Sequence, residues 1–185
     1  MNPLSLTKSP LFKTRPAGPL PGDILLFTAA PGLTKVIPWF TNSRYYHVGL
    51  YEGGPFSLEA RVNGVIRRDI SRDKQLVFRF VPMPREGANQ ALQFIRENLG
   101  ANYDLVDVAA IIINHSFPKL RINYSNPTSF TCGELIAKAW EAAGIDLFPD
   151  TQPELIVPGD FARFLPVDAR DRVLHNGKWD YQMPG

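Results

Sequence analysis

The sequence predicts an α+β domain, because strand patterns come first along the chain, helix patterns follow, and a hairpin pattern comes last. Apolar and polar residues alternate with a period of two through much of residues 45–70, which is typical of half-buried strands. Between residues 87 and 144 the apolar residues recur at helical spacing instead. The 185 residues fit one domain with a single buried core.

Strand signals fill the first half of the chain. The apolar run GDILLFT, residues 22–28, follows a proline and predicts a buried strand. The alternating residues 45–70 are broken at Gly53-Gly54 and at Asn63-Gly64, which are both hairpin signals. The run QLVFRFVPM, residues 75–83, predicts one more strand.

Helix signals follow, and the chain then returns to the sheet. The spacing predicts helices over residues 87–100, 103–114 and 131–144. In the first of them Gly100 is a stop signal, and four apolar residues share one stripe: Ala91, Leu92, Ile95 and Leu99. Residues 173–181, VLHNGKWDY, contain an Asn-Gly turn and predict a closing hairpin.

The first 18 residues predict a flexible N-terminal arm, and residues 19–185 a single domain. The arm has no apolar core of signal-peptide length, because Lys8, Lys13 and Arg15 interrupt it. The longest apolar run, residues 106–114, is too short to cross a bilayer. We therefore expect no integral membrane segment and a cytoplasmic location, with release by lysis or by unconventional export as the alternative.

Composition argues against several kinds of partner. Hydrophobic residues make up 44% of the chain and charged residues 21%, as in soluble globular proteins. A net charge of +2 gives a weak electrostatic case for binding nucleic acid. One cysteine cannot form an internal disulfide or a cysteine-rich zinc site, and no other ligand spacing predicts a metal. We expect no cofactor, no metal and no nucleic acid.

Cys132, the single cysteine, lies in the stretch SFTCGELIAKAW, residues 129–140. Thr131 and Glu134 have the spacing of a capping box, which makes Cys132 the first residue of the helix. At that end of a helix the dipole favours a thiolate, and free backbone N–H groups can bind an oxyanion. The alternative is that Cys132 is a small buried hydrophobic residue without chemistry.

His47 and Glu59 are the candidate partners of this thiol. His47 interrupts an otherwise apolar strand, and Glu59 follows on the next strand. If the loop between them has an odd number of residues, both side chains share one face of the hairpin and Glu59 can orient the imidazole. Two alternatives remain open: His47 is a satisfied half-buried imidazole, and Glu59 forms a cross-strand salt bridge with an arginine such as Arg67.

Four segments together resemble a known family: PGDILLF, YYHVGLY, LEARVNGV and FTCGELIAKAW. In this order they are similar to the circularly permuted branch of the NlpC-type, papain-like cysteine hydrolases, which also includes lecithin:retinol acyltransferase-like enzymes. The histidine strand precedes the cysteine helix, as in that branch. The resemblance implies a papain-like fold, in which a small antiparallel sheet or half-barrel packs against about three helices. It also implies a nucleophile at Cys132, a general base and acid at His47 and an orienting group at Glu59.

Further positions match the family less specifically. Tyr103-Asp104 resembles the "YD" of the family, and residues 158–164, PGDFARF, resemble its late P-x-D element. We assign Tyr103 to substrate binding or to the oxyanion hole. Tyr46 and Asn42 are further candidates for oxyanion donors, beside the amide of Cys132 itself.

The sequence therefore predicts a cysteine hydrolase that cleaves a peptide amide through an acyl-thioester, with a peptide or another small acyl compound as its substrate. The first alternative is an acyltransferase, thioesterase or esterase acting on a lipid or another acyl ester. It is favoured by aromatic stretches, VIPWF and IIINHSF, that could line an apolar pocket. The second alternative is a binding module that has kept the fold and whose thiol is idle.

Overall fold

The computed structural model describes residues 19–28, 43, 45–73, 75–79, 81, 85–104, 128–164, 172–175 and 178–181. The predicted arm of residues 1–18 lies outside this part of the chain. So do Asn42, both aromatic stretches that could line an apolar pocket and residues 105–114 of the second predicted helix.

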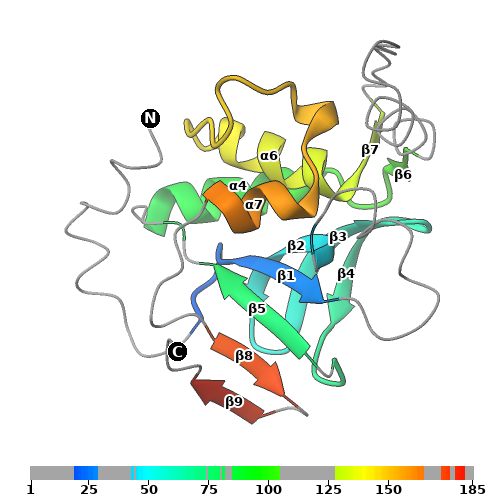
Figure 1. The fold of residues 1–185 in the computed structure, drawn as a ribbon. Coiled ribbons are helices and arrows are strands. Elements are labelled where there is room, and N and C mark those ends of the chain that lie inside the picture. The colour runs from blue at the N-terminus through cyan, green and yellow to red at the C-terminus, as the bar shows by residue number, and fades with distance from the viewer. Residues whose placement is uncertain are drawn as a thin grey trace.

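Within the described residues, seven strands form one antiparallel sheet in the order β4-β3-β2-β1-β5-β8-β9 (Figure 1). Their bounds are Ile24–Thr28 for β1, Tyr45–Gly53 for β2, Phe56–Arg61 for β3, Gly64–Asp69 for β4, Gln75–Arg79 for β5, Arg172–His175 for β8 and Lys178–Tyr181 for β9. The closing hairpin β8-β9 adds to β5, as the Asn-Gly signal predicts.

The glycines of the two central hairpins have backbone angles that other residues rarely adopt. Gly53 and Gly54, between β2 and β3, have φ of 116° and 57°, and Gly64 at the start of β4 has φ of 102°. Both turns therefore lie where the Gly53-Gly54 and Asn63-Gly64 signals predict them.

The described helices are α4 (Arg85–Glu97), α6 (Cys132–Ala142), α7 (Pro158–Phe164) and the short 3-10 helix η2 (Pro153–Leu155). The α-helices lie together on one side of the sheet (Figure 1). A separate parallel pair joins β6 (Asn102–Tyr103) to β7 (Ser129–Phe130). Sheet and helices confirm the α+β class.

Two details differ from the sequence prediction. Leu99 does not extend the buried stripe of α4, because the helix ends at Glu97 and Leu99 lies 45% exposed in the turn that follows. Tyr103 is a strand residue of β6 and does not begin a helix, because it pairs with Phe130. In both places tertiary pairing or chain reversal overrides a pattern of helical spacing.

The buried side chains form two clusters, one on each face of the sheet. The larger one contains residues of both the sheet and the helices, among them Val48, Leu50, Leu135 and Trp140. The smaller one contains Leu25, Phe27, Tyr51, Ile70, Leu76 and Phe78. Alternation along the strands separates them, because neighbouring residues point to opposite faces.

Candidate active site

Cys132 begins α6, as the capping box predicts. Thr131 is the N-cap: its hydroxyl accepts from the Glu134 N–H at 3.2 Å, and its own N–H donates to Glu134 Oε2 at 3.2 Å. The helix then buries the predicted apolar stripe, including Leu135, Ile136 and Trp140. The thiol, in a side chain only 8% exposed, therefore lies beside the free backbone N–H groups of a helix start.

Gly133 lets another part of the chain approach this helix start closely. A Cβ atom at residue 133 would lie 1.9 Å from the carbonyl oxygen of Ile156, which precedes α7. No side chain fits in that space, so glycine is required beside Cys132.

His47 lies on β2 next to an irregularity in the sheet. The register of β1 against β2 shifts between Phe27, which pairs with His47, and Thr28, which pairs with Tyr45. Tyr46 is thus the extra residue of a β-bulge, a feature that bends a strand and changes the direction of nearby side chains. The His47 ring lies against the Phe27 ring, with 5.0 Å between their centroids.

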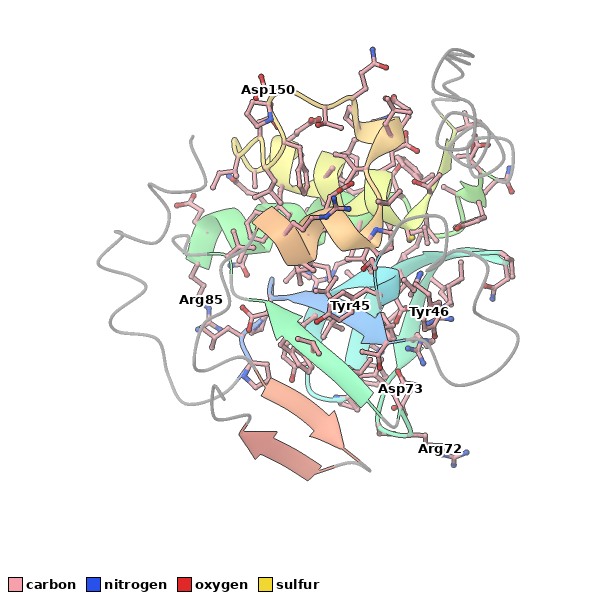
Figure 2. The ribbon with its side chains drawn as sticks, in the orientation of Figure 1. Tyr45, Tyr46, Arg72, Asp73, Arg85 and Asp150 are labelled. Atoms are coloured by element: carbon pink, nitrogen blue, oxygen red, sulfur yellow. The ribbon has the colours of Figure 1, made fainter. Side chains whose placement is uncertain are left out.

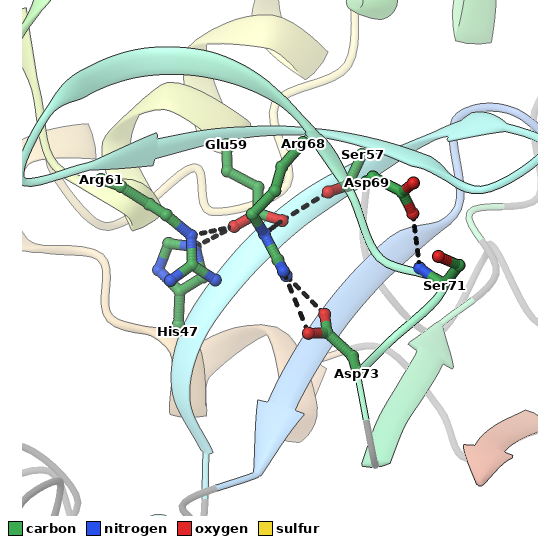
Figure 3. Close-up of polar contacts among 8 residues, drawn as sticks. All are labelled: His47, Ser57, Glu59, Arg61, Arg68, Asp69, Ser71 and Asp73. Carbon is green, nitrogen blue, oxygen red and sulfur yellow. Dashed lines mark hydrogen bonds and ion pairs between the residues drawn. The ribbon is translucent and has the colours of Figure 1, made fainter. Parts of the chain in front are cut away.

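Glu59 shares a face with His47, so the register condition for their contact is met. Leu50 pairs with Leu58, and the same register places Gly49 opposite Glu59 and His47 opposite Arg61. Glu59 reaches diagonally across Gly49, where a Cβ atom would lie 2.8 Å from Glu59 Cγ. Its Oε2 lies 2.8 Å from His47 Nε2 (Figure 3).

The other side of the imidazole meets the thiol. The side chains of His47 and Cys132 are hydrogen-bonded to each other, while Nε2 of His47 is engaged by Glu59. Burial disfavours charge on both groups. Their mutual hydrogen bond and charge nevertheless lower the pKa of the Cys132 thiol, helped by backbone N–H groups of Val48 and Gly133. The same contact, together with Glu59, raises the pKa of His47.

Glu59 is a fully buried carboxylate surrounded by donors (Figure 3). Its Oε1 accepts from the Ser57 hydroxyl and, at 2.9 Å, from Arg68 Nε, and its Oε2 accepts from Arg61 Nε at 2.5 Å. Burial opposes ionisation, but His47, Arg61 and Ser57 lower the pKa of Glu59 to about 2. Glu59 is therefore an anion at neutral pH and holds the charge as well as the orientation of His47.

Glu59 forms salt bridges in addition to its contact with His47, but with arginines other than Arg67. Arg67 binds Glu52, at 2.5 Å, and not Glu59. Sequence reasoning did not identify Arg61 and Arg68 as members of this network. Their positions in the sequence could have indicated this contact, because Arg61 follows Glu59 by two residues and Arg68 lies on the next strand. Residues placed in this way can share the face of the sheet on which Glu59 lies.

Tyr103 lies against the thiol from a third side. The β6-β7 pair brings it beside the start of α6, and a buried hydrogen bond of 2.5 Å joins Ser129 Oγ of β7 to Oδ2 of Asp104, the residue after β6. Burial, together with the charge and hydrogen bond of Cys132, raises the pKa of Tyr103. Its hydroxyl therefore keeps its proton and can donate to sulfur or to an oxyanion.

Tyr46 takes a different place from Tyr103. It is half-buried where β1 ends (Figure 2), and its ring centroid lies 6.2 Å from that of His47. Over the described ranges the structure gives no contact between Tyr46 and Cys132. Tyr46 thus neighbours His47, and Asn42 lies outside the described residues.

The described part of the chain contains no cluster of three or more His, Cys, Asp or Glu side chains placed to hold a metal ion. No helix in that part is long and apolar enough to cross a bilayer. No protein-family model and no curated protein matches the chain. Cys132, His47, Glu59 and Tyr103 are therefore the side chains whose chemistry points to a function.

Proposed function

We propose that this protein is a cysteine hydrolase that cleaves an amide bond through an acyl-thioester intermediate. The observation that carries the proposal is the imidazole of His47, hydrogen-bonded on one side to the Glu59 carboxylate and on the other to the Cys132 thiol. A carboxylate that orients a base, and a base that is hydrogen-bonded to a nucleophile, are the parts that covalent acyl transfer requires.

The reaction follows from the charges of these three groups. His47 takes the thiol proton, and the Cys132 thiolate attacks the acyl carbon, so that an S–C bond forms and the carbonyl becomes an oxyanion. The C–N bond then breaks as His47 returns its proton to the leaving amine. Water, deprotonated by His47, attacks the thioester, and the sulfur leaves as the thiolate. Glu59 stays ionised throughout and stabilises the imidazolium.

The oxyanion has donors on two sides in this arrangement. The start of α6 offers backbone N–H groups next to Cys132, and the Tyr103 hydroxyl remains protonated beside the sulfur. Tyr103 is in this proposal the side-chain donor, whereas Tyr46 supports the position of His47.

The resemblance to permuted NlpC-type hydrolases favours a peptide amide over an ester. An acyl ester would pass through the same thioester, so acyl transfer or ester hydrolysis is the alternative within this chemistry. The pattern that favoured it from sequence, the two aromatic stretches, lies outside the described residues.

The pH dependence of alkylation tests the proposal without a known substrate. A thiol paired with His47 should react with iodoacetamide well below about pH 8.5, where a free cysteine ordinarily ionises. His47→Ala should move the reaction back toward that pH, and Cys132→Ala should abolish labelling. In a screen of aminoacyl and short acyl-ester reporters, Cys132→Ala should lose several orders of magnitude in rate. Ordinary thiol reactivity, or full activity of Cys132→Ala, would show an idle thiol.

A further inference from the structure

Arg61 and Arg68 both bind Glu59, but they differ in how many of their donors are used. Arg68 donates through Nε to Glu59 and through both terminal nitrogens to Asp73, at 3.0 and 2.5 Å. Arg61 donates through Nε to Glu59. Among the residues that the structure describes, the terminal nitrogens of Arg61 have no hydrogen-bond partner. Arg61 therefore presents an unused edge of its guanidinium group.

Glu59 cannot take up these spare donors. Each of its oxygens already accepts two hydrogen bonds, from Ser57 and Arg68 on Oε1 and from His47 and Arg61 on Oε2. A carboxylate has about four acceptor sites, so this one is saturated. The unused terminal N–H donors of Arg61 are therefore available to a second anion.

Arg61 lies close to two residues whose side chains are hydrogen-bonded to the thiol, His47 and Tyr103. It shares Glu59 Oε2 with His47, and the strand register places it opposite His47 (Figure 3). Its charge also acts on Tyr103, whose hydroxyl is hydrogen-bonded to Cys132. The guanidinium carbon lies 5.4 Å from the centroid of the Phe27 ring, which helps to fix its position.

We propose that Arg61 binds a carboxylate of the substrate, so that the enzyme acts on acyl compounds that carry a carboxylate close to the bond that is cleaved. The inference rests on the proposed function. A guanidinium edge with two parallel N–H donors matches a carboxylate in a bidentate contact. The Arg61 side chain is 28% exposed, which leaves it accessible yet partly shielded from water. Arg68, whose three nitrogens all donate to Glu59 or Asp73, holds Glu59 in place and does not take part in substrate binding.

Two alkylating reagents test this inference directly, because they differ in charge and not in reaction. Iodoacetate carries a carboxylate next to the carbon that the thiolate attacks, and iodoacetamide carries a neutral amide there. In both, an S–C bond forms and iodide leaves with the electron pair. The same thiolate attacks both reagents, so the ratio of their rates at one pH cancels any change in the pKa of Cys132.

Arg61→Met should lower the ratio of the iodoacetate rate to the iodoacetamide rate by about tenfold, the value of one charge-assisted contact. Arg61→Lys should keep most of the ratio, and added salt should reduce it in the wild-type protein. Arg67→Met is the matched control: it removes a nearby arginine that binds Glu52, and it should leave the ratio unchanged. Equal ratios in wild type and Arg61→Met would overturn the inference.

The substrate class has its own readout. Nitrophenyl esters of succinate and of butyrate differ by a terminal carboxylate, and Arg61→Met should lose kcat/KM for the succinyl ester about tenfold more than for the butyryl ester. A failure of the proposed function appears differently, as iodoacetamide reactivity only near about pH 8.5. Even then the ratio of the two reagents at about pH 9, where an ordinary thiol is ionised, reports whether Arg61 attracts a carboxylate.

Discussion

Two fully buried glutamates flank the candidate nucleophile, and they have opposite electrostatic environments. Glu59, in the sheet, accepts from His47, Arg61, Arg68 and Ser57, and its pKa falls to about 2. Glu134, in the first turn of α6, binds one cation, Lys138, at 2.6 Å. Burial outweighs that contact, and the neighbouring Glu154 adds repulsion, so the pKa of Glu134 is raised.

The difference shows that burial alone does not decide what a carboxylate does. Glu59 is an anion at neutral pH, because three positively charged or ionisable donors converge on it, and it can stabilise an imidazolium. Glu134 closes the capping box and shares its single cation with Glu154. Glu59 fixes the position of His47, and Glu134 supports the helix that begins at Cys132.

Removal of the Glu59 carboxylate should have the largest effect. Glu59→Ala leaves Arg61 and Arg68 without their shared anion, which we expect to cost about 3–5 kcal/mol of stability in urea unfolding. Glu52→Ala is the control, because Glu52 also binds two arginines, Arg67 and Arg96, but these are more exposed. It should cost under about 1 kcal/mol. Similar losses of stability in Glu59→Ala and Glu52→Ala would contradict this difference between the buried and the more exposed carboxylate.

Acid should reveal the opposite signs of the two glutamates. The folded-state pKa of Glu59 is depressed, so its contribution, about 3 kcal/mol, is present above pH 4.5 and is lost as the pH falls toward 2. The folded-state pKa of Glu134 is raised, so its ionisation costs stability as the pH rises. On acidification, the stability advantage of wild type over Glu59→Gln should shrink. The stability of wild type relative to Glu134→Gln should instead increase on acidification. Parallel pH curves for both variants would refute this assignment.

The glycines beside the two glutamates allow a paired test. Gly133→Ala would place a Cβ atom 1.9 Å from the backbone oxygen of Ile156, and we expect it to cost about 3 kcal/mol. Gly49→Ala would press on the Glu59 side chain and on the Leu58 carbonyl, at 2.8 and 3.2 Å. It should cost less stability, about 1–2 kcal/mol, but shift the alkylation pH profile of Cys132 through His47. A reversed order of stability losses, measured by thermal unfolding, would argue against these close approaches.

The smallest effect should come from the helix cap. Glu134→Ala removes one half of the capping box and should cost about 1 kcal/mol, while Thr131→Ala should cost a similar amount. Both variants should keep the low-pH alkylation of Cys132, because Glu59 and His47 are untouched. If Glu134→Ala shifted that profile as strongly as Glu59→Gln, the division of roles between the glutamates would be wrong.

Much of the frame of the site follows from local sequence. Cys132 as the first helical residue follows from Thr131 and Glu134, because a capping box involves four consecutive residues. The hairpin turns follow from Gly53-Gly54 and Asn63-Gly64 in the same way. The α+β class, the seven strands of the main sheet and the return of the chain to that sheet at β8 are all visible as patterns of spacing.

Other parts of the site have no local signature. Alternation allowed Glu59 to face either His47 or an arginine, and the structure has it binding His47, Arg61 and Arg68 at once. The bulge at Tyr46 arises from the pairing of β1 with β2, and the place of Tyr103 depends on its pairing with Phe130, far later in the chain. The spacing predicted helix at both Leu99 and Tyr103, whereas α4 ends at Glu97 before Leu99, and Tyr103 pairs with Phe130.

Local sequence is enough to say which side chain begins a helix and which faces one side of a strand, because those features depend on neighbours along the chain. Long-range packing determines which of those side chains meet. The packing of α6 against β2 brings Cys132 to His47 and gives its thiol a lowered pKa. The space left by Gly49 and the convergence of two arginines on one carboxylate give Glu59 its charge. Burial and convergent hydrogen bonds create those properties, and both depend on contacts between distant parts of the chain.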